Sequence, residues 1–90
     1  MATVFVLHRV REFGKWREVY DGAAGMQAAG GVLEEAVFRT DGDPDNVLVM
    51  HRFASMSEAR AYFENPDLAD AVREAGVDES TVRLEFYEEA

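Results

Sequence analysis

The spacing of hydrophobic residues changes along the chain, from strand-like runs to helical periodicity and back. Residues 3–10 (TVFVLHRV) are apolar or β-branched at almost every position, which is typical of a strand covered on both faces. From Phe13 onward, apolar side chains recur every three or four residues with charged residues between them, which predicts a helix. Gly30 and Gly31 are expected to end that helix.

A turn-forming segment, residues 41–46 (DGDPDN), follows a predicted strand at 32–39 and precedes another at 47–53. Because turn residues separate the two apolar runs, we expect these strands to form a hairpin. The rest of the pattern predicts, in chain order, a helix capped by Ser55 or Ser57, an interruption at Pro66, a helical continuation over 68–75 ended by Gly76, and a last strand over 82–88.

An internal repeat divides the chain into two related halves. Residues 4–10 (VFVLHRV) align with residues 47–53 (VLVMHRF) at a constant offset of 43, and Tyr20 aligns with Phe63 at the same offset. Two βαβ halves related in this way predict a single α+β domain over residues 1–90 with element order β-α-β-β-α-β. The expected fold is a ferredoxin-like split βαβ whose antiparallel sheet has strand order 4-1-3-2.

One face of such a sheet has no helix to cover it. By strand alternation, the side chains that point to this face include Phe5, Leu7, Leu48 and Met50. The simplest cover is the same sheet of a second copy, which predicts a homodimer whose two sheets pack face to face as a dimeric α/β barrel. A different protein is the alternative partner for this face.

The charge balance narrows the classes of partner. The chain has 18 acidic and nine basic residues and a net charge of −9, which argues against nucleic acid and anionic membrane as partners.

No apolar run is long enough to span a bilayer and no cleavable leader is recognisable, so we expect a cytoplasmic protein. Arg9 and Arg52 fall on the uncovered face, where we expect them to pair with carboxylates of either subunit, such as Glu34, Glu35 or Glu85.

The sequence contains no established cofactor or metal motif. It has no cysteine, which excludes thiolate zinc sites and cysteine nucleophiles, and no HExxH, GxGxxG or Walker sequence. Carboxylates alternate over residues 41–45 as at the start of a calcium loop, but Asn46 and Arg52 stand where such a loop needs glycine and glutamate. We therefore expect neither a cofactor nor a metal ion.

His8 and His51 are the only histidines, and they occupy equivalent positions in the repeat. Alternation directs both imidazoles to the helix-covered side of the sheet, among aliphatic and aromatic neighbours. A histidine in a partly dry pocket can act as a general base at neutral pH, so His8 and His51 are the candidate catalytic residues. The alternative is that both are polar strand ends bonded to backbone or water.

Aromatic residues are the candidates for contacting a small hydrophobic or aromatic ligand. They recur at helical spacing or lie near strand ends, and any tyrosine among them can donate a hydrogen bond to a developing oxyanion. The same spacing also suits ordinary core packing. The candidates are Trp16, Tyr20, Phe53, Tyr62, Phe63 and Tyr87.

Several short motifs resemble the dimeric α/β-barrel superfamily, in particular its antibiotic-biosynthesis-monooxygenase-like and small cyclase-like members. They are the opening VFVLHRV strand, Phe13-x-x-Trp16, the HRFAS segment over 51–55 and the aromatic last strand LEFY over 84–87. The resemblance implies a ligand pocket within each protomer, between sheet and helices, with Phe53 and His8 in its lining. Many members carry a histidine near the position of Tyr62, and its absence here argues against haem ligation.

The resemblance and the residues together suggest a function. They favour a cofactor-independent monooxygenase- or cyclase-like enzyme acting on a small aromatic or polyketide-like metabolite, with a histidine as general base. The alternative is a non-catalytic dimer that binds a small ligand or is associated with stress, in which the same side chains only pack.

Overall fold

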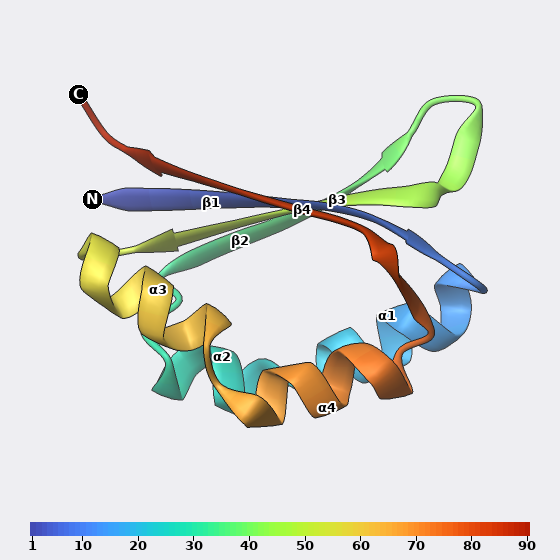
Figure 1. Ribbon diagram of the computed structural model, residues 1–90, viewed down its shortest axis with the longest axis horizontal. Helices are drawn as coiled ribbons and strands as arrows, with labels where there is room; N and C mark the ends of the chain where they lie inside the picture. The colour runs from blue at the N-terminus through green and yellow to red at the C-terminus, as the bar shows by residue number, and fades with distance from the viewer.

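A four-stranded antiparallel sheet carries all the helices on one of its faces in the computed structural model, which describes residues 1–90 (Figure 1). In chain order the elements are β1 (Ala2–Val10), α1 (Phe13–Gly22), α2 (Ala24–Ala29), β2 (Glu34–Thr40), β3 (Asp43–Phe53), α3 (Met56–Phe63), α4 (Pro66–Glu74) and β4 (Val77–Glu88). The strand order is β2-β3-β1-β4. This is the predicted order 4-1-3-2 read from the other edge, and it confirms the ferredoxin-like fold.

Side-chain and proline caps explain where the helices of the second half begin. The Ser55 side chain accepts a hydrogen bond from the Glu58 amide, so Ser55 is the N-cap of α3. The Asn65 side chain accepts from the Asp67 amide, and Pro66 occupies the first turn of α4, where its missing N–H does no harm. The predicted interruption at Pro66 is therefore the start of a separate helix.

Three boundaries differ from the sequence-based expectation. The helix expected from Phe13 to Gly30 is two helices, with a break at Ala23. The hairpin between β2 and β3 turns at residues 41–42, with Gly42 at a φ of 78°, while residues 43–46 already belong to β3. The last strand begins at Val77 and not at residue 82, because the backbone after Gly76 enters the sheet directly.

The predicted alternation along the two central strands is confirmed. The side chains buried on the helix-covered face are Val4, His8 and Val10 of β1 and Val47, Val49, His51 and Phe53 of β3. One buried cluster gathers around Phe53 and Tyr62, and a second gathers around Trp16. Both histidines therefore lie on the side of the sheet where the sequence predicted them.

The opposite sheet face is partly apolar and has no helix over it (Figure 1). Phe38 and Tyr87 on this face are 52% and 50% exposed. Arg52 pairs here with Glu34 and with Glu89, at 3.3 and 2.8 Å. Arg9 pairs with Asp43 of the hairpin at 2.7 Å, which corrects the expectation that it would bind Glu34, Glu35 or Glu85.

The pairing of β1 with β4 is interrupted opposite His8. Leu7 pairs with Arg83 and Arg9 pairs with Asp78, so residues 79–82 form a bulge that faces the single residue His8. The backbone amide of Arg9 bonds the Thr81 hydroxyl at 2.9 Å in place of a strand carbonyl.

None of the four helices is long and apolar enough to cross a membrane.

Gly30 lies against the ring of Tyr62, and we expect that any larger residue there will destabilise the fold. A Cβ atom on Gly30 would overlap Cδ1 of Tyr62 and come within 3.1 Å of Cε1. Gly30→Ala should therefore lower the free energy of unfolding by about 1–3 kcal/mol, because the buried ring has to move. The measurement is urea unfolding.

Gly25→Ala is the matched control for this substitution. Nothing lies within 4 Å of a Cβ at Gly25 in α2, so the change should be neutral or should stabilise by up to about 1 kcal/mol through helix propensity. Equal effects of the two substitutions would contradict the close packing of Gly30 on Tyr62.

Candidate active site

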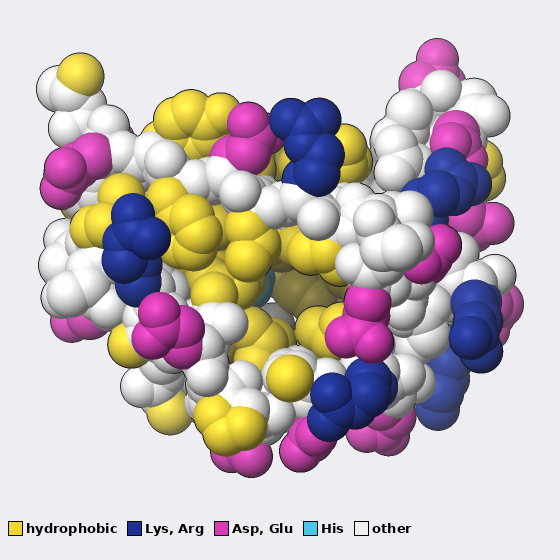
Figure 2. All heavy atoms as spheres, in the orientation of Figure 1, with side chains coloured by type: hydrophobic (Ala, Val, Ile, Leu, Met, Phe, Trp, Pro, Cys, Tyr) yellow, Lys and Arg dark blue, Asp and Glu magenta, His cyan; other side chains and the backbone are white.

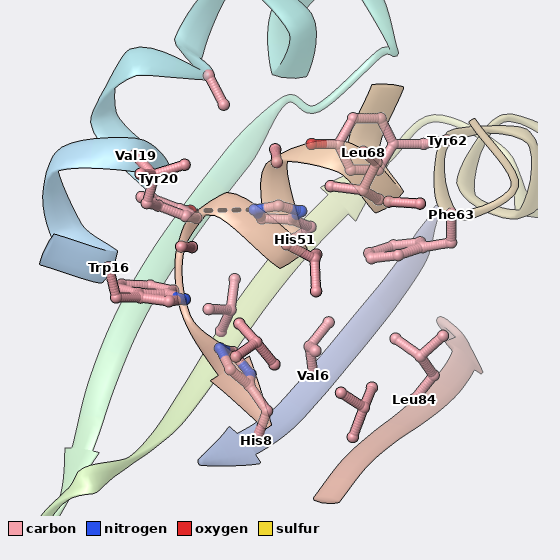
Figure 3. Close-up of a pocket in the computed structure, with 18 of the residues that line it drawn as sticks. Val6, His8, Trp16, Val19, Tyr20, His51, Tyr62, Phe63, Leu68 and Leu84 are labelled. Atoms are coloured by element: carbon pink, nitrogen blue, oxygen red, sulfur yellow. Dashed lines mark hydrogen bonds between the residues drawn. The ribbon is translucent and has the colours of Figure 1, made fainter. Parts of the chain in front are cut away.

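A cavity of about 280 Å³ lies between the helix-covered face of the sheet and the helices. Figure 2 looks into it, and hydrophobic side chains surround a hollow in which a histidine is visible. Sixteen of its twenty lining residues are hydrophobic, so the space suits an apolar ligand. Figure 3 shows the principal lining residues: Val6, His8, Trp16, Val19, Tyr20, His51, Tyr62, Phe63, Leu68 and Leu84.

The two central strands supply the cavity floor. Val6 of β1 pairs with Val49 of β3, and both line the cavity. His8 lies two residues beyond Val6 on β1, and His51 lies two residues beyond Val49 on the antiparallel β3. The imidazoles are therefore at opposite ends of an aliphatic floor, one contributed by each half of the repeat (Figure 3).

A row of aromatic side chains on α1 forms one wall. Trp16 stacks on Tyr20 with ring centroids 4.9 Å apart and planes 17° apart, because residues four apart share one helix face. Trp16 also lies 5.6 Å from the ring of His8. Tyr62 and Phe63 of α3 meet edge to face at 5.1 Å on the other side of the space. Flat rings thus border the cavity from two helices.

Six of the eight residues predicted for the site line this cavity, namely His8, Trp16, Tyr20, His51, Tyr62 and Phe63. Phe53 does not line it, because its side chain is fully buried in the cluster around Tyr62. Tyr87 lies on the other face of the sheet, where it packs against Phe5 and donates to Glu85. Its pairing with Thr3 gives it the orientation of the open face, which corrects the expectation that it would contact a ligand here.

One histidine belongs to a chain of hydrogen bonds that reaches the protein surface. The Tyr20 hydroxyl lies 2.6 Å from Oε1 of Glu35 and 3.0 Å from Nε2 of His51 (Figure 3 draws the second contact). Glu35 is opposite His51 in the pairing of β2 with β3, and its side chain is exposed. Tyr20 therefore joins a buried imidazole to a carboxylate in solvent.

Burial shifts the proton affinities of the ring side chains around the cavity. It lowers the pKa of His8, and it lowers the pKa of His51 to about 4, so both imidazoles are neutral at pH 7. Burial also raises the pKa of Tyr62 to about 12, and burial together with the bond to Glu35 raises the pKa of Tyr20. Nδ1 of each histidine is buried and has no hydrogen-bond partner.

Three polar residues of the site, two of which line the cavity, were missed by the sequence analysis. Glu35 was assigned to the open face, although it has the same parity on β2 as Val37 and the register places it opposite His51. Gln27 of α2 is buried, and the sequence feature that could have identified it is a single amide side chain within an otherwise apolar helical stretch. Glu79 lines the cavity from the β4 bulge, and no sequence pattern predicts this bulge. No group of three His, Cys, Asp or Glu side chains comes together as metal ligands.

Comparison with known proteins identifies the fold. No protein-family model matches the sequence, and no curated protein matches it significantly. Solved structures match over the full length: an antibiotic biosynthesis monooxygenase covers 100% of this chain and 99% of its own, with TM-score 0.75 and 9% identity. The cofactor-independent oxygenase SnoaB from Streptomyces nogalater matches with TM-score 0.76 and 10% identity, covering 99% of this chain and 91% of its own.

This chain has the antibiotic-biosynthesis-monooxygenase fold. A conserved protein from Methanosarcina mazei Go1 shares it too, with TM-score 0.79, 7% identity, and coverage of 99% of this chain and 92% of its own. At such identities the antibiotic-biosynthesis-monooxygenase fold alone is established, because one fold supports several functions. The activity of this chain has to be argued from its own cavity.

Because the pKa of His51 is lowered, the free energy of unfolding should decrease as the pH is lowered through a defined window. An unfolded histidine takes up a proton near pH 6.5, whereas folded His51 does so near 4. Between these values only the unfolded chain gains the proton, so unfolding becomes easier as pH falls from 6.5 to 4. The loss due to His51 should reach about 3 kcal/mol and should be absent above pH 6.5.

Urea unfolding of wild type and of His51→Phe across this pH range measures the effect. The carboxylates are common to both proteins, so the difference in pH dependence isolates the histidine. The slope of stability against pH should be smaller in the variant, and parallel curves would contradict a buried neutral His51.

Proposed function

We propose that this protein is a cofactor-independent enzyme, of the monooxygenase or cyclase type, acting on an uncharged aromatic or polyketide-like metabolite. The observation that carries the proposal is the pair of buried, neutral imidazoles that border a largely apolar cavity. Buried polar atoms without partners are rare in folded proteins and concentrate at functional sites. The likeness of fold to SnoaB, which is itself a cofactor-independent oxygenase, supports the oxygenase type.

In this proposal a histidine removes a proton from the substrate. His8 or His51 accepts the proton of a phenol, or of a CH group flanked by carbonyls, and becomes an imidazolium. In the oxygenase version the resulting anion is the reductant and forms a C–O bond to dioxygen; the imidazolium returns its proton to the peroxide, which then loses water together with the second hydrogen on that carbon and leaves a carbonyl. In the cyclase version the anion is an enolate that attacks a carbonyl carbon and closes a ring, and the imidazolium protonates the alkoxide. The Tyr62 hydroxyl, which is neutral at pH 7 and makes no hydrogen bond within the protein, donates to the developing oxyanion.

The charge of the cavity lining indicates the substrate class. No lysine or arginine lines the cavity, and Glu79 is its one charged residue. The whole chain also carries a net charge of −9. A substrate with a carboxylate or phosphate would enter this space without any compensating cation, which is unfavourable in a poorly hydrated site. We therefore assign an uncharged substrate.

A second candidate function is binding without catalysis. The low pKa values of His8 and His51 favour it, because a general base is most effective when its pKa is near the working pH. In this version the protein holds a flat ligand between the aromatic walls and releases it unchanged. Ligand-induced thermal shifts without turnover would identify this function.

We also propose that the open sheet face joins two copies of the chain. Its apolar side chains alternate with ion pairs of both signs, such as Arg52 with Glu34 and Arg83 with Glu85. A face that carries both charges can complement itself across a two-fold axis. The sheets of two copies would then enclose the apolar side chains that each copy leaves exposed.

Dioxygen uptake with anthrone-like and naphthol-like phenols tests the catalytic proposal. Wild type should consume dioxygen, and the His8→Ala/His51→Ala double variant should be slower by about 10²–10⁴-fold, because both candidate proton acceptors are gone. Analogues of the same phenols that carry a carboxylate should be poor substrates. Undiminished turnover in the folded double variant would refute the role of the histidines.

Tyr87→Phe is the control for this assay. Tyr87 is on the opposite face of the sheet, so removing its hydroxyl should leave dioxygen uptake unchanged. If no phenol is oxidised by wild type, oxygenation is excluded for this panel, and product analysis of enolisable polycarbonyl compounds then tests cyclisation.

Size-exclusion chromatography with light scattering tests the dimer. Wild type should elute as a dimer, and Phe38→Glu should raise the dissociation constant at least about 100-fold, because a charge is placed in the apolar interface twice. Leu33→Glu is the matched control, since Leu33 is equally exposed but lies outside the sheet. A monomeric wild type would overturn the proposal.

A further inference from the structure

The two histidines have the same place in the repeat but different surroundings. In the pairing of β2 with β3, Glu35 stands opposite His51. In the pairing of β1 with β4, the ladder is broken at His8, and the bulge of residues 79–82 puts no paired residue opposite it. Only His51 therefore has a carboxylate held at a fixed place on the neighbouring strand.

The proton count along the chain of hydrogen bonds fixes the tautomer of His51. Tyr20 has a single hydroxyl proton, and it lies 2.6 Å from Glu35 and 3.0 Å from His51. Tyr20 donates this proton to the Glu35 carboxylate, so the proton points away from His51. The Tyr20 oxygen then has only lone pairs left for His51, and Nε2 of His51 must be the donor.

Because His51 is neutral, a proton on Nε2 leaves Nδ1 without one. That nitrogen is buried and has no partner within the protein, in a side chain that lines the cavity. An unpaired buried acceptor destabilises the folded protein unless something donates to it. Because Nδ1 is covered in this structure, a ligand hydroxyl would supply the missing donor once the side chains over that nitrogen shift.

We propose that Glu35 and Tyr20 are positioning residues that hold the His51 proton on Nε2, so that Nδ1 is kept as the acceptor for a hydroxyl of the substrate. This inference rests on the proposed function for its chemistry, and it selects His51 as the proton acceptor and Nδ1 as the atom. The exposed Glu35 carboxylate thereby controls a buried nitrogen through one phenol. In a catalytic triad a carboxylate orients the imidazole directly; here the Glu35 carboxylate orients the imidazole of His51 through the hydroxyl of Tyr20.

Tyr20 is the one side chain that hydrogen-bonds His51, and the other titratable residues of the cavity, His8, Tyr62 and Glu79, do not. Tyr62 of α3 lies 5.8 Å from His51 between ring centroids and is a neutral phenol at pH 7. Arg17 of α1 lies over Tyr20 at 5.5 Å and is directed at its ring. The residues that α4 adds to the cavity are Leu68, Ala69, Ala71 and Val72, and Ala75 follows at the C-cap; none of these side chains ionises.

Nitrogen-15 NMR of the imidazole rings tests the proposal without any substrate. With two histidines in the chain the spectrum contains two rings, and a His8→Phe variant assigns them. At pH 7 wild-type His51 should show a protonated Nε2 and a bare Nδ1. A bare Nε2, or an even mixture of tautomers, would overturn the proposal.

Two variants and a matched control establish which residues fix the proton. In Glu35→Ala the Tyr20 hydroxyl loses its acceptor and can donate to His51, so the Nδ1–H form should appear. In Tyr20→Phe the constraint is gone, and the two tautomers should mix. Glu34→Ala removes a neighbouring carboxylate that faces the other side of the sheet and binds Arg52, and it should leave the tautomer unchanged. Unchanged tautomers in both Glu35→Ala and Tyr20→Phe would refute the positioning role.

Kinetics with a substrate found in the dioxygen assay give the functional readout. Glu35→Ala should lower kcat at least about tenfold with a smaller change in KM, because substrate binding is mostly apolar while the acceptor nitrogen is misplaced. An unchanged kcat in a variant whose tautomer has switched would refute Nδ1 as the acceptor. Absence of turnover in wild type would instead count against the proposed function, while the tautomer result stands by itself.

Discussion

The antiparallel pairing of β1 with β3 in the middle of the sheet decides where every other side chain of interest lies. Val6 pairs with Val49, and the alternation that follows sends His8 and His51 to the helix side and the arginines next to them to the open side. A slip of one residue would exchange the two faces and put both imidazoles outside. The buried side chains of both strands fix this register by packing under the helices, so the fold and the cavity are products of one constraint.

Much of this arrangement was predictable from the sequence because it depends on local periodicity. The repeat of residues 4–10 at 47–53 gave both central strands and the common face of their histidines, and helical spacing placed Trp16 and Tyr20 together. The errors come from non-local register. Tyr87 was assigned to the cavity because it is aromatic, but its side depends on which residue of β1 it pairs with. Glu35 was assigned to the wrong face for the same reason, and with it the link to His51 was missed.

The bulge and the hairpin could not be predicted for a different physical reason. Residues 79–82 contain no glycine or proline, and their departure from the ladder is stabilised by a bond that forms only in the fold, from the Arg9 amide to the Thr81 hydroxyl at 2.9 Å. In the hairpin, the pair of Arg9 with Asp43 extends β3 into a segment whose composition is typical of turns. In both places a long-range contact overrides the local preference.

The interruption in β4 has a further effect at the rim of the molecule. β4 is the last strand on its side of the sheet, and its outward amides and carbonyls are free to pair with a strand of another chain. Ser80 folds its amide and hydroxyl onto the carboxylate of Asp78, so the row of edge groups is broken near the start of the strand. The bulge of residues 79–82, which lies opposite His8, thus also protects the exposed edge of the sheet from uncontrolled edge-to-edge association and fibre formation.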